Sequence, residues 1–86
     1  MSARLEHVAR GIAAHLSRFD RENVGGGRFR GAEAYAAPAS ACVRVRYRRE
    51  ESLFALRLGE AEEYLRRLDR GFVCKHFSPP GAEVEG

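Results

Sequence analysis

The amino-acid sequence predicts an α+β domain with the element order α-β-β-β-α-β, in which two helices pack on one face of an antiparallel sheet. Residues 3–22 and 59–70 repeat apolar side chains at three- and four-residue steps, which is typical of amphipathic helices. Residues 42–58 alternate apolar and outward-facing side chains at every second position, as a half-buried hairpin does. These apolar faces are expected to pack together, because none of them can be buried alone.

The length and composition predict one small globular domain. With 86 residues the chain can build a single modest core, which we expect over residues 1–81, followed by a frayed tail at 82–86. Hydrophobic residues make up 44% of the chain and charged residues 31%, which is a globular composition. No apolar stretch approaches the roughly 18 residues of a membrane span, and the first residues do not resemble a signal peptide. A cytoplasmic location without membrane contact is therefore expected.

The first helix is expected over residues 3–22, with Ser2 as its N-cap. Gly11 lies inside this helix and costs about 1 kcal/mol relative to alanine, which is tolerable if another element packs closely there. The three glycines at 25–27 should end the helix and make residues 24–28 a flexible loop. The apolar stripe consists of Leu5, Val8, Ile12, Leu16 and Phe19.

The glycine-rich segment does not match a nucleotide-binding loop. Its glycines follow a helix rather than a strand, their spacing differs from G-x-G-x-x-G, and no G-K-[ST] sequence is present. The sequence RFRG at 28–31 resembles one unit of arginine–glycine–aromatic RNA-binding tails, but such tails act through repetition. A short strand over residues 29–36, with a turn at Pro38 and Ser40, is the expected structure.

The central hairpin has one apolar face and one basic face. A charged turn at 49–52 joins its two strands. The apolar face is expected to contain Val43, Val45, Tyr47, Phe54, Leu56 and Leu58. We call the opposite set the arginine face, and it consists of Arg44, Arg46, Arg48 and Arg57.

The second helix is expected over residues 59–70. Glutamates in its first turn and arginines in its last turn both complement the helix dipole, and Gly71 is the expected stop. Its apolar stripe consists of Ala61, Tyr64, Leu65 and Leu68. Residues 72–77 are long enough for one further strand at the edge of the sheet, which the sequence SPPG at 78–81 would end.

The sequence does not favour catalysis or metal binding. Cys74 and His76 lack a second Cys/His pair at the spacing of a zinc site. His7 and His15 lie eight residues apart, whereas metal ligands on one helix usually lie three or four apart. A nucleophile pair of His76 with Cys42 or Cys74 would need a pocket, for which so short a domain has little room. We expect reduced cysteines, no enzyme, no cofactor and no metal.

Binding through the arginine face is the function that the pattern favours, with Arg28, Phe29 and Arg30 expected beside it. All but Lys75 of the fifteen Lys+Arg residues are arginine, which suits bidentate contacts to carboxylate or phosphate, although GC-rich codon usage explains the arginines equally well. Our first hypothesis is a non-catalytic adaptor, subunit or inhibitor that docks onto a protein or nucleoprotein partner.

Three alternatives stay open. The same basic face could bind DNA or RNA directly, pair with a second copy to form a homodimer, or be solvated without any partner. Two observations weigh against nucleic acid. The net charge is only +3, and the outward face of the hairpin carries no aromatic side chain on which a base could stack.

Overall fold

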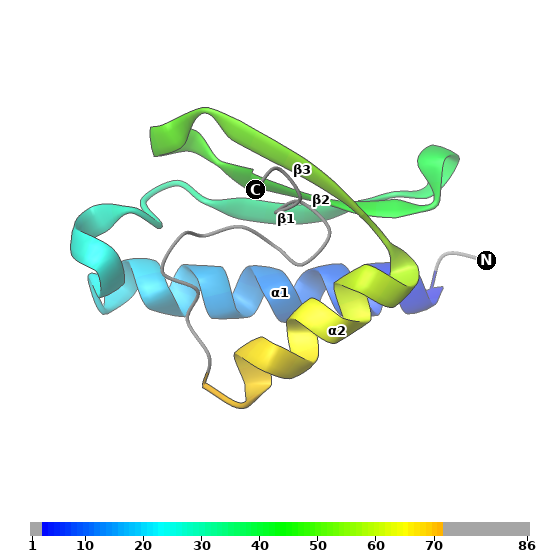
Figure 1. The fold of residues 1–86 in the computed structure, drawn as a ribbon, viewed down its shortest axis with the longest axis horizontal. Helices are drawn as coiled ribbons and strands as arrows, with labels where there is room; N and C mark the ends of the chain where they lie inside the picture. Colours follow the sequence, from blue (N-terminus) through cyan, green and yellow to red (C-terminus); the bar gives the residue numbers. More distant parts are fainter. Residues whose placement is uncertain (1–2, 72–86) are drawn as a thin grey trace, which may run out of the picture.

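The computed structural model describes residues 3–71, except for the side chain of Glu50 (Figure 1). Its helices and strands are α1 (Ala3–Arg21), β1 (Glu33–Ala37), β2 (Cys42–Tyr47), β3 (Ser52–Arg57) and α2 (Leu58–Asp69). Short 3-10 turns at Val24–Gly27, Pro38–Ser40 and Arg48–Glu50 connect them. The predicted N-cap at Ser2, the strand at 72–77 and the tail at 82–86 lie outside the described residues.

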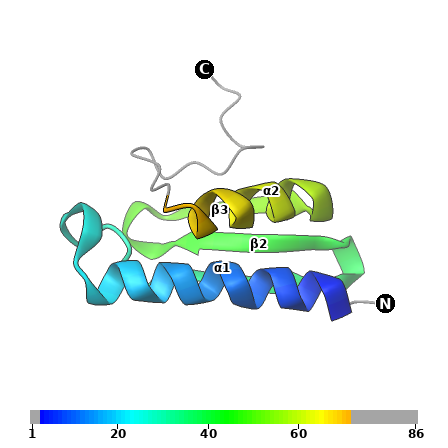
Figure 2. The ribbon, with the colours of Figure 1, turned by 90° about the horizontal axis from the view of Figure 1, so that it is seen from below.

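The three strands form an antiparallel sheet in which β2 lies between β1 and β3. At its middle, Val45 of β2 pairs with Ala34 of β1 and with Phe54 of β3. Both helices lie on one face of the sheet, and seen from below they lie on either side of β2 (Figures 1 and 2). α1 packs mainly against β1, α2 packs against β3 and β2, and the helices contact each other. The predicted α+β fold is confirmed.

The core lies between the sheet and the helices and agrees closely with the sequence pattern. Every residue of the predicted α1 stripe is buried, as are the predicted apolar residues of β2. Phe54, Leu58 and Leu65 are only partly buried. Phe54 belongs to β3, which is an edge strand of the described sheet, and Leu58 is the first residue of α2. Positions at the border of the layer therefore retain contact with solvent.

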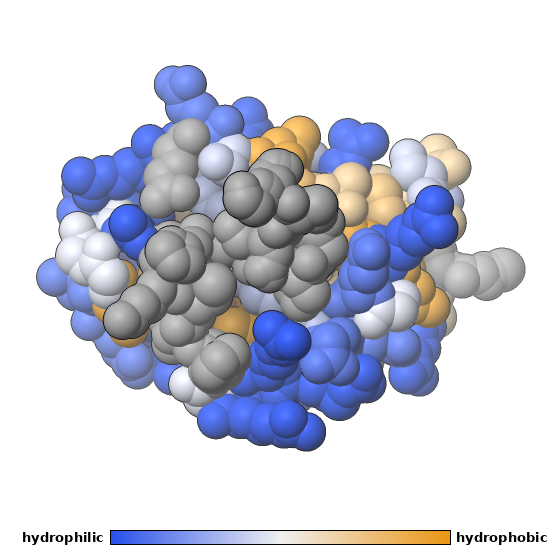
Figure 3. All heavy atoms as spheres, in the orientation of Figure 1, coloured by the Kyte–Doolittle hydropathy of each residue, from blue (hydrophilic) through white to orange (hydrophobic). Residues whose placement is uncertain are grey.

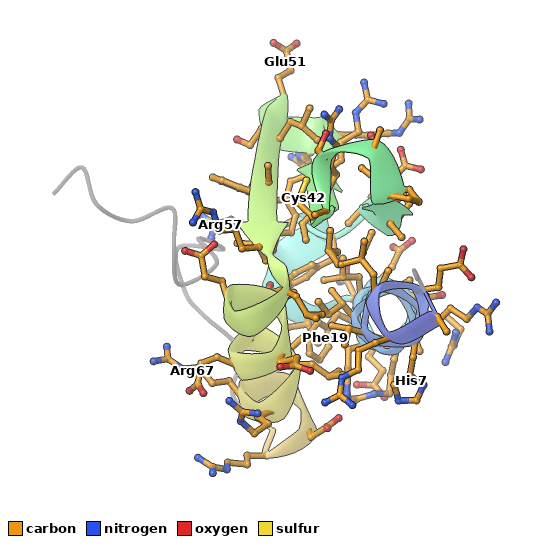
Figure 4. The ribbon with its side chains drawn as sticks, turned by 90° about the vertical axis from the view of Figure 1, so that its right-hand side faces the viewer. His7, Phe19, Cys42, Glu51, Arg57 and Arg67 are labelled. Atoms are coloured by element: carbon orange, nitrogen blue, oxygen red, sulfur yellow. The ribbon has the colours of Figure 1, made fainter. Side chains whose placement is uncertain are left out.

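The first strand begins later than predicted. It starts at Glu33 rather than at Phe29, because Gly27 and Gly31 adopt positive φ angles of 94° and 74° and interrupt the extended chain. Phe29 is 2% exposed, and its ring centroid lies 5.0 Å from that of Phe19 and 6.0 Å from that of Tyr47. Figure 4 shows Phe19 between the helices and the sheet. The turn therefore directs Phe29 into the core.

Gly11 lies where the two helices meet. A β-carbon added to Gly11 would lie 3.0 Å from both δ-carbons of Leu65 in α2, so the glycine makes room for that side chain. One helical turn further along α1, Nε2 of His15 lies 2.7 Å from Oδ1 of Asp69 in α2. The helix-propensity cost of Gly11 is thus explained by close helix packing.

Candidate functional site

The surface residues singled out by the sequence lie mostly on the outer face of the sheet, the face that turns away from both helices. Side chains alternate across a strand, so burial of Val43, Val45 and Tyr47 toward the helices turns their neighbours outward. Among the described elements, neither helix covers this face (Figure 1). The outer face carries, strand by strand, Glu33, Tyr35, Ala37, Cys42, Arg44, Arg46, Leu53, Ala55 and Arg57.

Arg44 lies at the centre of the outer face, between Tyr35 of β1 and Ala55 of β3. Hydrogen bonds to Cys42 and then to Tyr35 raise the pKa of Arg44 above its ordinary value, because both partners stabilise the charged guanidinium. Its Nε atom is buried and has no hydrogen-bond partner. Arg44 thus lies against Cys42 and Tyr35 on the sheet, and its Nε–H is a donor without a partner.

Arg46 and Arg48 converge on one carboxylate. Nη1 of Arg46 lies 3.6 Å, and Nη2 of Arg48 3.2 Å, from the same Oε2 atom of Glu33. Arg46 is the cross-strand partner of Glu33, whereas Arg48 reaches it from the turn that follows β2. The strand prediction that began at Phe29 did not single out Glu33. The signal available was that it lies two residues before Tyr35, on the same face of a short strand.

Arg57 lies at the other end of the outer face. It pairs with Cys42, the first residue of β2, while Arg46 pairs with Leu53 near the start of β3. Figure 4 places Arg57 beside the start of α2 and Glu51 at the opposite end of β3. The backbone N–H of Arg57 donates to the Glu60 carboxylate at 3.0 Å, which caps α2. The structure therefore brings Arg46 and Arg48 together and leaves Arg57 apart from them.

The loop residues Arg28, Phe29 and Arg30 differ in their positions. Phe29 belongs to the core cluster, so the prediction that it serves a partner-binding surface is wrong. Its turn conformation, rather than the predicted strand, carries the ring inward. Arg30 is exposed and Arg28 is half-buried. The loop does approach the arginine face, because a β-carbon on Gly31 would lie 3.1 Å from Cδ of Arg48.

Two large apolar side chains are exposed in the described part of the chain, and both lie on the outer face. Tyr35 is 41% exposed and Leu53 is 54% exposed. Tyr35 pairs with Arg44, and Leu53 pairs with Arg46. The position of Leu53 follows from the alternation along β3, whereas the position of Tyr35 depends on the register of β1 against β2. Figure 3 shows apolar atoms along β3 that are bordered by hydrophilic ones.

A shallow hollow opens beside the paired arginines. It has a volume of about 380 Å³ and lies at the end of the sheet where the β2–β3 turn is located. Apolar, hydroxyl, acidic and basic groups all line it. The lining residues are Arg46, Arg48, Glu51, Ser52 and Leu53.

Among residues 3–71, the nearest approach to a catalytic arrangement is at His15, away from the outer face. Its Nε2 lies 2.7 Å from Asp69 Oδ1, and its Nδ1 lies 3.1 Å from Nη2 of Arg18. Arginine can only donate, so Nδ1 of His15 is placed to accept from Arg18 and Nε2–H to donate to Asp69. The third member is a cation rather than a nucleophile. This arrangement links α1 to α2 and does not form a hydrolytic triad.

Comparisons and the remaining chemistry supply no further assignment. Within residues 3–71, no group of three or more His, Cys, Asp or Glu side chains is placed to hold a metal ion. No helix in this part of the chain combines the length and the apolar character needed to cross a membrane. Comparison of the chain with protein-family models, with curated proteins and with solved structures gave no match.

Proposed function

We propose that the protein is a non-catalytic binding protein of the adaptor, subunit or inhibitor type, which docks onto a protein or nucleoprotein partner through the outer face. One observation carries this proposal: Tyr35 and Leu53 are exposed on the same sheet face as Arg44 and Arg46, the face opposite both helices. Tyrosine and arginine are enriched among the residues that dominate binding energy in protein interfaces. Burial of the apolar pair would favour association, and the arginines would orient it.

The charge of the outer face favours an acidic protein partner. Glu33 is the acidic residue of the three strands, and it faces more than one arginine. A partner with carboxylates around an apolar centre would meet complementary charge at the rim and apolar contact at Leu53. Complementary charges raise the association rate and suppress wrong partners.

Direct binding of DNA or RNA is the second candidate, and Tyr35 is the observation that favours it. An aromatic ring on a sheet face beside an arginine can stack on an unpaired base. Against this, Leu53 offers no apolar contact to a phosphate backbone, although it is the most exposed large apolar side chain of this face. The balance of these contacts supports a protein partner first.

The proposal is tested by affinity capture from the native cell with and without nuclease, comparing wild type with a Tyr35→Ala/Leu53→Ala double variant. The double variant should lose the captured partner, because the central apolar contacts are gone. Arg67→Ala on α2 is the control, since Figure 4 shows Arg67 away from the sheet. Equal capture by the double variant would refute docking through this face. Capture that nuclease abolishes would favour the nucleic-acid alternative.

Charge reversal gives an independent test on the same surface. Arg46→Glu/Arg57→Glu should abolish capture of the partner while the melting temperature stays within a few degrees of wild type. Both side chains are exposed, and exposed substitutions usually change stability by less than about 0.5 kcal/mol. Retained capture by a folded double variant would contradict the role of the arginines.

A further inference from the structure

We infer that Arg46 and Arg48 form a carboxylate-binding site for the partner, and that Glu33 of the protein itself occupies this site until a partner carboxylate displaces it. The inference rests on the proposed function, whose docking face contains the site. It also specifies the partner's chemistry, a glutamate or aspartate side chain next to an aliphatic residue.

The geometry of the two arginines is that of a site for one carboxylate. Their guanidinium groups approach a single oxygen, Oε2 of Glu33, at 3.6 Å from Arg46 and 3.2 Å from Arg48. The arginines lie two residues apart and face the same side of the chain, and the pairing of β1 with β2 brings Glu33 to both of them. The aliphatic part of Arg48 lies against Gly31, where a β-carbon would come within 3.1 Å of Cδ. The absence of a side chain at Gly31 therefore allows Arg48 to reach the site.

Glu33 fills this site incompletely. Only Arg48 comes within hydrogen-bond distance of the carboxylate, and the contact from Arg46 is longer. Each guanidinium has five N–H donors, so most of the donors of the pair are not used by Glu33. The three side chains are 41–57% exposed. Water therefore competes with these ion pairs, and they contribute little to folding stability. A second carboxylate can replace Glu33 at small cost.

The hollow beside the arginines indicates what would accompany the incoming carboxylate. It measures about 380 Å³, and Leu53 forms an apolar part of its lining next to Arg46 and Arg48. An acidic side chain reaching the arginines would place a neighbouring aliphatic residue over Leu53. A phosphate backbone would gain nothing from Leu53, whereas an aliphatic neighbour of the incoming carboxylate would bury it. Glu51 repels a phosphate and a carboxylate alike, so Leu53 is the feature that favours an acidic peptide over nucleic acid.

The expected behaviour of Glu33 follows from its position. As long as Glu33 occupies the site, a partner carboxylate must displace it before it can bind. Removing the charge of Glu33 should therefore tighten the binding of an acidic peptide. We expect Glu33→Gln to lower the dissociation constant about fivefold, which corresponds to roughly 1 kcal/mol, the upper range for an exposed ion pair.

The experiment measures the anisotropy of two fluorescent probes, a short glutamate–leucine peptide and a single-stranded oligonucleotide of equal charge. Wild type, Glu33→Gln and Arg46→Gln/Arg48→Gln are compared. The chain supplies a matched control in Glu63→Gln, because Glu63 on α2 is likewise shared by two arginines, at 2.8 and 3.5 Å. We expect tighter peptide binding by Glu33→Gln, loss in the double arginine variant, and no change in the control.

Each other outcome overturns the inference. Unchanged or weaker binding by Glu33→Gln would show that Glu33 does not occupy the site, and equal tightening by Glu63→Gln would reduce the effect to net charge. If wild type bound the oligonucleotide more tightly than the peptide, the proposed peptide ligand would be wrong. Absence of peptide binding by wild type and Glu33→Gln would remove the site. The capture experiment with Tyr35→Ala/Leu53→Ala judges the proposed function separately.

Discussion

Replacing Gly11 with alanine would test how closely the two helices are packed. In an exposed helix this change stabilises by about 1 kcal/mol, because alanine has the higher helix propensity. In this structure the new β-carbon would lie 3.0 Å from both δ-carbons of Leu65 and 3.6 Å from its γ-carbon. Carbon atoms prefer separations of about 3.5–4.0 Å, so the Leu65 side chain or α2 must shift.

The balance of these two effects predicts whether Gly11→Ala stabilises or destabilises the protein. Overpacking costs about 1–3 kcal/mol, and the gain in helix propensity offsets about 1 kcal/mol of that. Leu65 is only partly buried and can yield in part, so we expect a net destabilisation of about 1 kcal/mol. In a Leu65→Ala background the obstruction is absent, and the same change at Gly11 should stabilise by about 1 kcal/mol.

Urea unfolding followed by circular dichroism measures the free energy of unfolding of wild type, Gly11→Ala, Leu65→Ala and the double variant. The effect of Gly11→Ala is then compared with and without the Leu65 side chain. Ala14→Gly is the control, because Ala14 is exposed on α1 and its substitution should cost about 1 kcal/mol in both backgrounds. A change of about 1 kcal/mol moves the melting temperature of a domain of this size by about 4–8 °C, which is readily measured. Stabilisation by Gly11→Ala in the presence of Leu65 would refute the close contact.

Three further predictions concern other contacts. The buried hydroxyls of Tyr47 and Tyr64 lie 2.7 Å apart, so a double-mutant cycle with Tyr47→Phe and Tyr64→Phe should give a coupling of about 1 kcal/mol in urea unfolding; additivity would contradict the bond. Gly26 has φ +68°, and a β-carbon added there would meet nothing within 4 Å, so Gly26→Ala should destabilise by about 1 kcal/mol through backbone strain alone, and a neutral effect would contradict it. A hydrogen bond from Arg66 lowers the pKa of Glu63 below its ordinary value of 4.5. The ionised Glu63 side chain therefore stabilises the fold above that pH, and this stabilisation is lost as the pH falls through the lowered pKa. Glu63→Gln should therefore flatten the acid-side decline in melting temperature between about pH 6 and pH 3, and an unchanged slope would refute this.

The predicted arginine face was correct as a face but not as a single cluster. Alternation along β2 and β3 placed Arg44, Arg46 and Arg57 on the side opposite the core, as the register shows. Alternation says nothing about how far apart such residues lie along the strands or which carboxylates they meet. The separation of Arg57 from Arg46 follows from the register between β2 and β3, and the carboxylate that Arg46 meets follows from pairing with β1, where Glu33 lies opposite it.

The helices, the central hairpin and most of the core could be predicted from the amino-acid sequence without other information. These features depend on periodicity within one segment, because a helix or strand must bury the side of the chain on which its apolar residues recur. The apolar stripe of α1 and the alternation of β2 each indicate the buried side of their own segment. No residue from elsewhere in the chain was needed to identify which side each buries.

The start of β1, the burial of Phe29 and the partners of the outer face became apparent only in the folded protein. Phe29 lies in a short glycine-flanked segment without periodicity, and a gap between Phe19 and Tyr47 holds its ring. The pairing of Glu33 with Arg46 and of Tyr35 with Arg44 depends on strand register. Register is fixed by packing between segments distant in sequence, which is why the pattern of a single strand could not reveal these contacts.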